Sequence, residues 1–531
     1  MAANEEAGTD KISGVHAFGD LEIWWGGFMT RATPLTPESL WAIFHEGSSS
    51  PALICPDDGT VVSHGELASA VHRLAGVLAG FGVARGQRVA LVLPNGPEIV
   101  ELLLAVVLCG ATAAPMNPGY AEAEYAFYLD DLDPSLLLVP TGQGADIRRA
   151  AGELAVADVS VQRHGPPQLS VAGTGAAVER SFDPGSPEDV ALLLHTSGTT
   201  RQPKRVPLLQ RNLMASLRAI GVHYQLDEAD VSYCAMPLFH VHGLIGSTLA
   251  QLAVGGAVVT PRRLTPRRYW QQVAAHGVTW VSAGPTIHQV LIEHGTARAP
   301  SFRFVRSCSS ALSPGLMERL EKIYEAPVLE AYGMTEASHQ MTSNPLPPRQ
   351  HWPGSVGIPA GAEVRIVDKA GRDVPAGHVG EVAVRGPGLT PGYLNDAQAN
   401  AESFFAGWFR TGDLGLLDEG YLRLKGRIKE LIIRGGENIS PAEVEAVLKA
   451  HPAVADAVCF GIDDEKYGQV VGAAVVLKGE ADGAELRARC GESLADFKVP
   501  KVIHIVREIP RTSTGKVQRN RIAAQLAGQG S

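Results

Sequence analysis

The chain has 531 residues, of which 45% are hydrophobic and 19% are charged, and this composition is typical of globular proteins. A chain of this length does not form one hydrophobic core, so we expect at least two domains. The net charge of −10 argues against a general nucleic-acid binder, because phosphate contacts require a basic surface.

Membrane and metal signals are also missing from the sequence. No apolar run approaches the ~20 residues of a membrane span. The six cysteines are scattered and form no CxxC pair, so neither a disulfide framework nor a zinc site is expected. The first residues are acidic and lack an apolar signal segment, and the last three do not read Ser-Lys-Leu, so we expect a cytoplasmic protein.

Short apolar runs alternate with helical patterns along most of the chain. After a poorly patterned leader at residues 1–34, Val89–Leu93 predicts a strand and Glu98–Leu108 the helix that follows it. The same alternation continues from about residue 192 to residue 332. Such alternation is typical of layered α/β structure.

The C-terminal third has a different pattern. Glycines and prolines interrupt short alternating runs between residues 354 and 424, which predicts a small β-rich module. Ser440-Pro441 is typical of a helix start, so we expect a helix over 442–450. Strands are expected at 455–460 and 470–477. We therefore predict an α/β protein with an N-terminal domain (35–425) of two layered subdomains plus the β-rich module, and a small, mobile α+β lid (426–531).

A turn of small residues follows the apolar run Val190–Leu194. It reads His-Thr-Ser-Gly-Thr-Thr-Arg-Gln-Pro-Lys from His195 to Lys204. Such a turn exposes several backbone N–H groups and hydroxyls, which suits a phosphate chain. It is not a Walker A loop, because no Gly-Lys-Ser/Thr follows Gly198 at the required spacing. We call residues 196–204 the phosphate loop.

Five other segments carry recognisable patterns: Ala235–Gly243 (Pro-Leu-Phe-His), Glu330–Glu336 (Tyr-Gly-x-Thr-Glu), Trp408–Asp413 (Thr-Gly-Asp), Gly426–Ile432 and Ile509–Lys516. Together with the phosphate loop they resemble the motifs of the adenylate-forming superfamily, which includes acyl-CoA ligases, luciferases and peptide-synthetase adenylation domains. The resemblance covers residues 36–520. The oxalate-CoA ligase branch is the most similar, through His195, Phe239–Gly243, Pro285–His288, Arg306–Ser309 and Arg434–Glu437.

The resemblance implies a reaction in two halves. A carboxylate is a poor electrophile, so it first becomes a mixed anhydride with AMP, and the thiol of coenzyme A then displaces AMP. Thr335 is expected to contact the α-phosphate and Glu336 to hold Mg²⁺, a cation that prefers oxygen ligands. Asp413 and Arg427 are expected at the ribose. Lys516 would supply positive charge during adenylation.

The resemblance also implies further roles. The other nucleotide-binding candidates are Thr196, Ser197, Gly198, Thr199, Thr200, Lys204, Tyr332 and Gly333. Lys429 corresponds to the hinge about which the lid rotates between the two half-reactions. Arg434, Gly435 and Gly436 would line the CoA tunnel. His240 is a candidate gate of the acyl site, with a packed wall residue as the alternative.

Two arginines depart from the family pattern. Arg201 and Arg205 stand where the phosphate loop usually has glycine or another small residue. Glycine lets the backbone approach an anion and adopt positive φ without strain. Either arginine could add charge for the pyrophosphate, fill the space of the β- and γ-phosphates, pin the loop against a nearby acid, or point to solvent. We expect adenylation by ATP to be impaired, while thioester formation from a preformed acyl-adenylate survives.

The acyl pocket departs as well. Gly284 and Gly333 replace larger residues of the oxalate-ligase pattern, which predicts an acid larger than oxalate. The sequence thus predicts an acyl-CoA ligase that uses ATP or acyl-AMP, CoA and Mg²⁺, and that is served by a separate adenylating enzyme if its own adenylation fails. An ordinary two-step ligase and a non-catalytic adenylate-binding scaffold are the alternatives.

Overall fold

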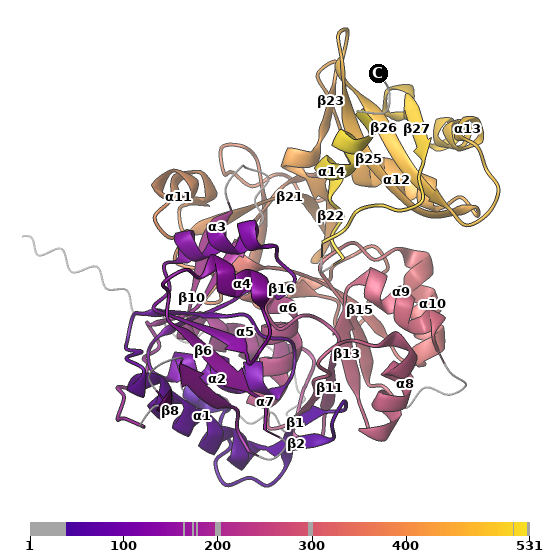
Figure 1. Ribbon diagram of the computed structural model, residues 1–531. Coiled ribbons are helices and arrows are strands. Elements are labelled where there is room, and N and C mark those ends of the chain that lie inside the picture. Colours follow the sequence, from indigo (N-terminus) through magenta and orange to yellow (C-terminus); the bar gives the residue numbers. More distant parts are fainter. Residues whose placement is uncertain are drawn as a thin grey trace, which may run out of the picture. The chain divides into compact units, whose positions relative to one another are not determined.

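The computed structural model describes residues 39–162, 165–171, 175–176, 179–196, 203–295, 301–512 and 515–527. The expected leader lies outside this part of the chain. Within it, helices and strands alternate as predicted, and the fold is α/β (Figure 1). No helix among these residues is long and apolar enough to cross a bilayer.

The first large sheet contains eight strands within the described ranges, in the order β10-β9-β4-β3-β5-β6-β7-β8. The pairs from β9 to β6 are parallel, and the pairs at both edges are antiparallel. The strand predicted at Val89–Leu93 is β3. The strands are β3 (Arg88–Leu91), β4 (Thr112–Pro115), β5 (Leu136–Pro140), β6 (Val156–Ser160), β7 (Gln168–Val171), β8 (Gly175–Ala176), β9 (Val190–Thr196) and β10 (Lys204–Leu209).

The second large sheet contains nine strands of the described chain, in the order β17-β16-β15-β14-β13-β11-β12-β1-β2. The strands from β1 to β15 in this order run parallel, and antiparallel hairpins complete both edges. They are β1 (Pro51–Cys55), β2 (Thr60–Ser63), β11 (Val231–Cys234), β12 (Ala257–Val259), β13 (Trp280–Ala283), β14 (Phe304–Ser307), β15 (Val328–Met334), β16 (His339–Ser343) and β17 (Ile358–Pro359).

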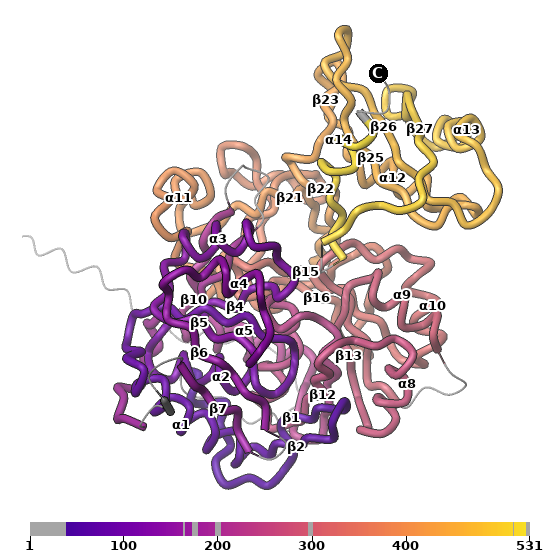
Figure 2. Tube along the Cα trace, in the orientation of Figure 1, coloured from indigo at the N-terminus to yellow at the C-terminus, as the bar shows by residue number. Residues whose placement is uncertain are grey.

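Helices pack on both large sheets, and α8, α9 and α10 (Figure 2) share one hydrophobic cluster with β13. The N-terminal helices are α1 (His64–Gly80), α2 (Pro97–Leu108), α3 (Glu122–Leu132), α4 (Ala145–Ala150), α5 (Gln210–His223), α6 (Val241–Gly243), α7 (Ala250–Ala253), α8 (Pro266–Ala275), α9 (Pro285–Glu293) and α10 (Pro314–Tyr324). Three further helical segments accompany them: η1 (Leu40–Ile43), η2 (Leu244–Leu249) and η3 (Thr335–Ala337).

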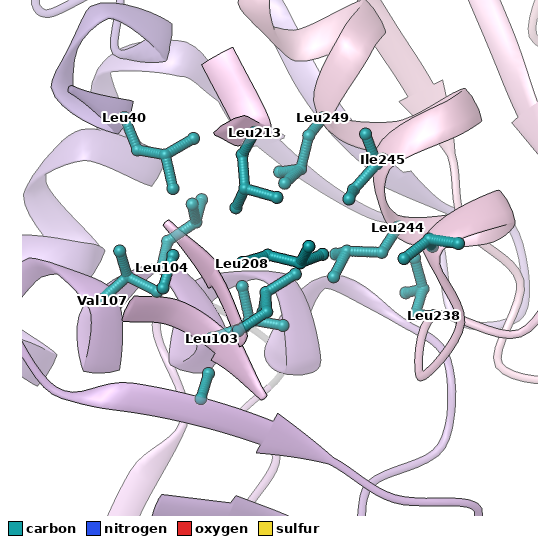
Figure 3. Packing of buried hydrophobic residues seen from close by; sticks show 14 of the residues in the cluster. Leu40, Leu103, Leu104, Val107, Leu208, Leu213, Leu238, Leu244, Ile245 and Leu249 are labelled. Carbon is teal, nitrogen blue, oxygen red and sulfur yellow. The ribbon is translucent and has the colours of Figure 1, made fainter. Parts of the chain in front are cut away.

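The largest hydrophobic core lies where these helices meet. Every residue of α2 is buried, as expected of a helix covered on all sides. Figure 3 shows leucines of α2 next to side chains of β10, α5 and η2. This core joins the two α/β layers and thereby fixes the loops that leave their strands.

The C-terminal third contains two smaller sheets. The β-rich module contains β18 (Glu363–Val367), β19 (Gly380–Arg385), β20 (Phe404–Phe405), β21 (Trp408–Asp418) and β22 (Tyr421–Arg427), with α11 (Ala397–Ser403). The last sheet contains β23 (Ile432–Arg434), β24 (Glu437–Ile439), β25 (Val454–Asp464), β26 (Gly468–Leu477) and β27 (Val502–Ile505). Its helical elements are η4 (Ile428–Glu430), α12 (Pro441–Lys449), α13 (Gly483–Ser493), η5 (Asp496–Lys498) and α14 (Arg519–Ala527). α12 begins at the predicted Ser440-Pro441 start.

Candidate active site

Candidate site residues lie at or after the carboxyl ends of strands in both large sheets. β9 ends at Thr196, the segment after β11 carries His240, and β13 is followed by Gly284. β15 ends directly before Thr335. Ligands of open α/β sheets bind outside the carboxyl ends of the strands, so these residues define the candidate site.

Glu336 is held by a tyrosine. Its side chain lies in η3 and is buried, and the Tyr393 hydroxyl donates a hydrogen bond to Glu336 Oε1 at 2.9 Å. Lys204 Nζ lies 4.2 Å from the centre of the Tyr393 ring, a favourable cation–π arrangement. Tyr393 therefore connects the lysine of the phosphate loop with the acid expected to hold Mg²⁺, a connection that the sequence did not predict.

Asp413 is buried between a tyrosine and an arginine. The Tyr332 hydroxyl donates a hydrogen bond to Asp413 Oδ2, and Arg427 Nε lies 3.0 Å from Asp413 Oδ1. Asp413 and Arg427 are cross-strand partners on β21 and β22, which explains why residues 14 positions apart meet. Burial raises the pKa of the Tyr332 hydroxyl well above its usual range, and the Asp413 charge adds to the effect.

Lys516 belongs to the same electrostatic environment. Burial lowers the pKa of its ammonium group, and the Arg427 guanidinium lowers it further. Nearby carboxylates partly oppose the shift: Glu430, Asp413 and Glu336. The structure therefore brings Lys516 into the charge environment of the residues expected at the nucleotide.

The expected hinge residue lies in a short helical turn, and the expected CoA residues lie at the hairpin that follows it. Lys429 is exposed in η4, a single turn between β22 and β23. Gly435 and Gly436 form the turn of the β23–β24 hairpin with φ of +59° and +92°, values that favour glycine. The Arg434 guanidinium donates a hydrogen bond to the Phe497 carbonyl at 2.6 Å.

Only part of the phosphate loop lies in the described ranges. Ser197, Gly198, Thr199, Thr200 and Arg201 fall outside them. Thr196 and Lys204 are cross-strand partners at the two ends of the loop. Arg205 Nη1 donates a hydrogen bond to the Asp131 carbonyl at 2.8 Å, so this side chain does not point freely into solvent.

His240 lines a pocket that opens next to Thr335. Burial lowers the pKa of the His240 imidazole to about 4, so it is neutral at physiological pH. The pocket is lined by Pro115, Met116, Asn117, Tyr120, Tyr128, Leu194, His195, Phe239, His240 and Thr335. Asn95 supports this wall: its amide donates to the Met236 carbonyl at 3.0 Å and accepts from the Leu238 N–H at 2.9 Å.

Gly333 lies where two backbones approach closely. A Cβ placed on Gly333 would lie 1.9 Å from the carbonyl oxygen of His339. The pairing of β15 with β16 shifts register between Tyr332 and Gly333, and glycine permits this close approach of two backbones. The missing side chain thus permits the strand pairing, and the contribution of Gly333 and Gly284 to a larger acyl pocket stays a prediction.

A buried arginine is the main feature that sequence reasoning missed. Arg306 is 0% exposed, and its guanidinium donates to three neutral oxygens, those of Tyr224, Ser282 and Gln340. No carboxylate of the described residues lies within ion-pair distance of it. An unpaired buried charge is costly, so Arg306 indicates a site where positive potential is useful.

Matches to two family models identify the family. The profile of the family described as "AMP-binding enzyme" matches residues 43–394, and that of its C-terminal domain matches residues 443–516. The chain belongs to the AMP-binding enzyme family.

Similar members are CoA ligases. The chain is 44% identical to an oxalate–CoA ligase of Arabidopsis thaliana, with 87% of this chain and 93% of that protein covered. It is 39% identical to a sulfoacetate–CoA ligase of Cupriavidus necator, with 88% and 93% covered. It is also similar to o-succinylbenzoate CoA synthetase of Bacillus subtilis in complex with its acyl-adenylate intermediate. That likeness has a TM-score of 0.81 and 32% identity, with 92% and 98% covered.

This AMP-binding enzyme is an acid–thiol ligase of the adenylate-forming superfamily. Ligases of this superfamily use ATP, an acyl-AMP intermediate, CoA and Mg²⁺. No group of three His, Cys, Asp or Glu side chains in the described ranges is arranged to hold a metal ion. Mg²⁺ needs no such group, because it binds through one or two carboxylates together with substrate phosphates. Glu336 fits that requirement, since Tyr393 occupies only one of its two carboxylate oxygens.

Proposed function

We propose that this ligase activates a short carboxylic acid that carries a second anionic group. A chain of hydrogen bonds from Arg306 to the exposed Ser309 supports this proposal. Arg306 Nη1 donates to Ser282 Oγ at 2.9 Å, and Ser282 Oγ lies 2.7 Å from His242 Nε2. His242 Nδ1 lies 2.8 Å from Ser309 Oγ.

The direction of this chain follows from the donors. Arg306 only donates, so the Ser282 hydroxyl can give its hydrogen to His242 Nε2. Burial keeps the pKa of His242 well below its usual range, and Arg306 lowers it further, so the neutral ring has one N–H, on Nδ1. That N–H donates to Ser309, whose own hydroxyl hydrogen is left for an anion. The acids named for the oxalate and sulfoacetate ligases both carry a second anionic group.

The test compares chain-length-matched acids. Thioester formation is measured with diacids and with monoacids of equal length, for the unmodified protein and for Ser309→Ala. The unmodified protein should prefer diacids by about a hundredfold or more, because a site built for hydrogen bonding discriminates strongly. Ser309→Ala should reduce that preference about tenfold. Equal use of monoacids by the unmodified protein would refute the proposal.

We assign the chemical steps to residues as follows. During adenylation, a carboxylate oxygen of the acid attacks the α-phosphorus of ATP and pyrophosphate leaves. Lys516 and Thr335 stabilise the charge that develops on the oxygens, and Asp413 binds the ribose. Glu336 would hold Mg²⁺, which neutralises phosphate charge when bound.

In the second half-reaction, the CoA thiolate attacks the acyl carbon and AMP leaves. We assign the CoA approach to Arg434, Gly435 and Gly436. The lid rotates about Lys429 between the two steps. The proposed boundary between domains 35–425 and 426–531 falls two residues before the end of β22 at Arg427, and the last sheet starts shortly after it at Ile432.

A preference for preformed acyl-adenylate over ATP is a second candidate feature. The contact of Arg205 with Asp131 favours it, because a tethered arginine replaces a small, adaptable residue beside the phosphates. A separate adenylating enzyme would then supply the intermediate, unless slow adenylation by this protein suffices. Arg201→Gly combined with Arg205→Gly should raise ATP–pyrophosphate exchange. Exchange by the unmodified protein as fast as its thioester step would instead indicate an ordinary two-step ligase.

A further inference from the structure

Three side chains form a cluster beside the phosphate loop. His195 on β9 and Arg205 on β10 are cross-strand partners, so their side chains lie on the same face of the sheet. Both reach Asp131 in the last turn of α3. We call His195, Asp131 and Arg205 the loop clamp.

The contacts of the loop clamp are short and partly shielded from water. His195 Nε2 lies 2.8 Å from Asp131 Oδ2, and Arg205 Nε lies 3.5 Å from the same oxygen. The three side chains are 12%, 30% and 19% exposed for His195, Asp131 and Arg205. Such partial burial strengthens the attraction between opposite charges.

Arg205 also caps α3. The last carbonyls of a helix lack partners within the helix, and a positive charge at this end is favourable. The bond from Arg205 Nη1 to the Asp131 carbonyl meets both conditions. The Asp131 carboxylate and the end of α3 therefore both bind the Arg205 guanidinium.

The Lys204 side chain points to the opposite face of the sheet from the Arg205 side chain. Successive residues of a strand face opposite sides of the sheet, and Lys204 stacks on Tyr393 while Arg205 binds α3. The two neighbouring cations thus lie on opposite faces of the sheet, with Lys204 on the face nearer Glu336. Arg205 is kept on the side of α3.

We propose that Asp131 is a positioning residue that sets the preference between ATP and acyl-adenylate. Through His195 and Arg205 it fastens both strands that flank the phosphate loop to α3, and it withholds the Arg205 charge from phosphates. ATP requires the loop to adapt to its β- and γ-phosphates, whereas an acyl-adenylate has only the α-phosphate. The clamp therefore penalises ATP selectively. This inference rests on the acyl-adenylate preference proposed above.

The test uses Asp131→Asn, Arg205→Gly and the double variant. The measured quantity is the ratio of kcat/KM for ATP, in pyrophosphate exchange, to kcat/KM for acyl-adenylate, in thioester formation. Each single variant should raise this ratio on the order of tenfold, the effect of one charge-assisted hydrogen bond. The double variant should exceed Arg205→Gly only by what the His195–Asp131 contact contributes, because Arg205→Gly already removes the ion pair that Asp131→Asn weakens.

Controls separate this effect from general damage. Asp158→Asn breaks the Arg148–Asp158 ion pair, whose side chains are 30% and 27% exposed, and should leave the ratio unchanged. Thermal unfolding of every variant checks the fold. Arg205→Gln removes the same guanidinium contact without introducing a glycine. It should raise the ratio as Arg205→Gly does.

The possible outcomes are distinct. A response to both Arg205 variants without a response to Asp131→Asn, or additive effects in the double variant, would overturn the role of Asp131 and leave the acyl-adenylate preference standing. If the unmodified protein has equal kcat/KM values for ATP and for acyl-adenylate, the proposed preference itself fails.

Discussion

Asp413 accepts one hydrogen bond, pairs with one arginine and still has room for a ligand. A carboxylate has about four lone-pair sites; Tyr332 uses one of them, and the Arg427 guanidinium lies beside the other oxygen. The remaining sites are available to the ribose hydroxyls that we propose Asp413 binds. Asp413→Ala should weaken the binding of ATP and of acyl-adenylate alike, by roughly 1.5–3 kcal/mol. Isothermal titration with a non-reactive acyl-adenylate analogue measures this change.

The control for Asp413 lies on the same strand. Asp418 is at the end of β21 and pairs with Arg423 on the surface, so Asp418→Ala should leave the affinity unchanged. An unchanged affinity in Asp413→Ala would remove Asp413 from the ribose site.

Lys516 should act in one half-reaction only. Lys516→Ala should lower ATP–pyrophosphate exchange at least a hundredfold, since groups that stabilise transition-state charge contribute about this much. Thioester formation should change far less, because in the proposed lid rotation the lysine leaves the site. Lys501→Ala, which removes a more exposed lysine paired with Asp464, is the control. Equal losses in both half-reactions would contradict the assignment.

The pKa of Lys516 gives this role a pH signature. Its ammonium must be charged to assist adenylation, and burial lowers its pKa from the ordinary lysine value. Exchange activity, measured as kcat/KM, should therefore fall on the alkaline side at a lower pH than an ordinary lysine would allow. Thioester formation should lack this alkaline decline, and Lys516→Arg should shift the decline of exchange to higher pH.

Residue-level prediction from the sequence had a clear limit. Motif spacing indicated Asp413, Lys516 and His240, because each stands in a recognisable local pattern. The roles of Arg306 and Asp131 were missed, since their partners come from distant parts of the chain. His195 and Asp131 are 64 positions apart, and only the packing of α3 on the sheet reveals their contact.

At the scale of elements, η4 is the proposed hinge. Lys429 lies in a helical turn, where the fixed φ of proline is tolerated. Lys429→Pro should therefore fold but lock the arrangement described here, in which Lys516 shares the environment of Asp413. Adenylation should persist and thioester formation should fall by about tenfold or more. Stopped-flow measurement of both half-reactions tests this, with Lys429→Ala as a control that keeps both. Full rates for both steps in the proline variant would locate the hinge elsewhere.

Elements were easier to predict than their arrangement. Apolar runs bounded by glycine and proline identified β3, α2 and α12 within a few residues, because burial and helix-start chemistry are local. The strand orders could not be predicted, since they depend on packing between distant segments. The close approach at Gly333 could not be predicted for the same reason, because the register shift between β15 and β16 is a property of the pair.

At the scale of the whole molecule, a buried acid should make stability depend on pH. Glu101 lies in the core helix α2, and burial raises its pKa to about 8 from an ordinary value of 4.5, with the Glu98 charge adding to the effect. Its contribution to stability is full below pH 4.5 and is lost as the pH rises toward 8. Each unit of pKa difference corresponds to about 1.4 kcal/mol.

Glu101→Gln should remove this dependence. The unfolding free energy of the variant should fall less between pH 5 and pH 8 than that of the unmodified protein, as measured by urea unfolding. Glu188→Gln, at an exposed position, should leave the dependence unchanged. A pH profile that Glu101→Gln does not alter would contradict the burial argument.

The most direct test of the central claim is CoA-thioester formation from free acids, ATP, Mg²⁺ and CoA, followed by mass spectrometry over long incubations. Acids are offered in pairs of equal chain length, with and without a second anionic group. The account predicts a thioester of the doubly anionic member of each pair and little or none of its partner. Thioesters of the monoacids in equal or greater yield would contradict it, as would the absence of a thioester both from every free acid with ATP and from every matching acyl-adenylate.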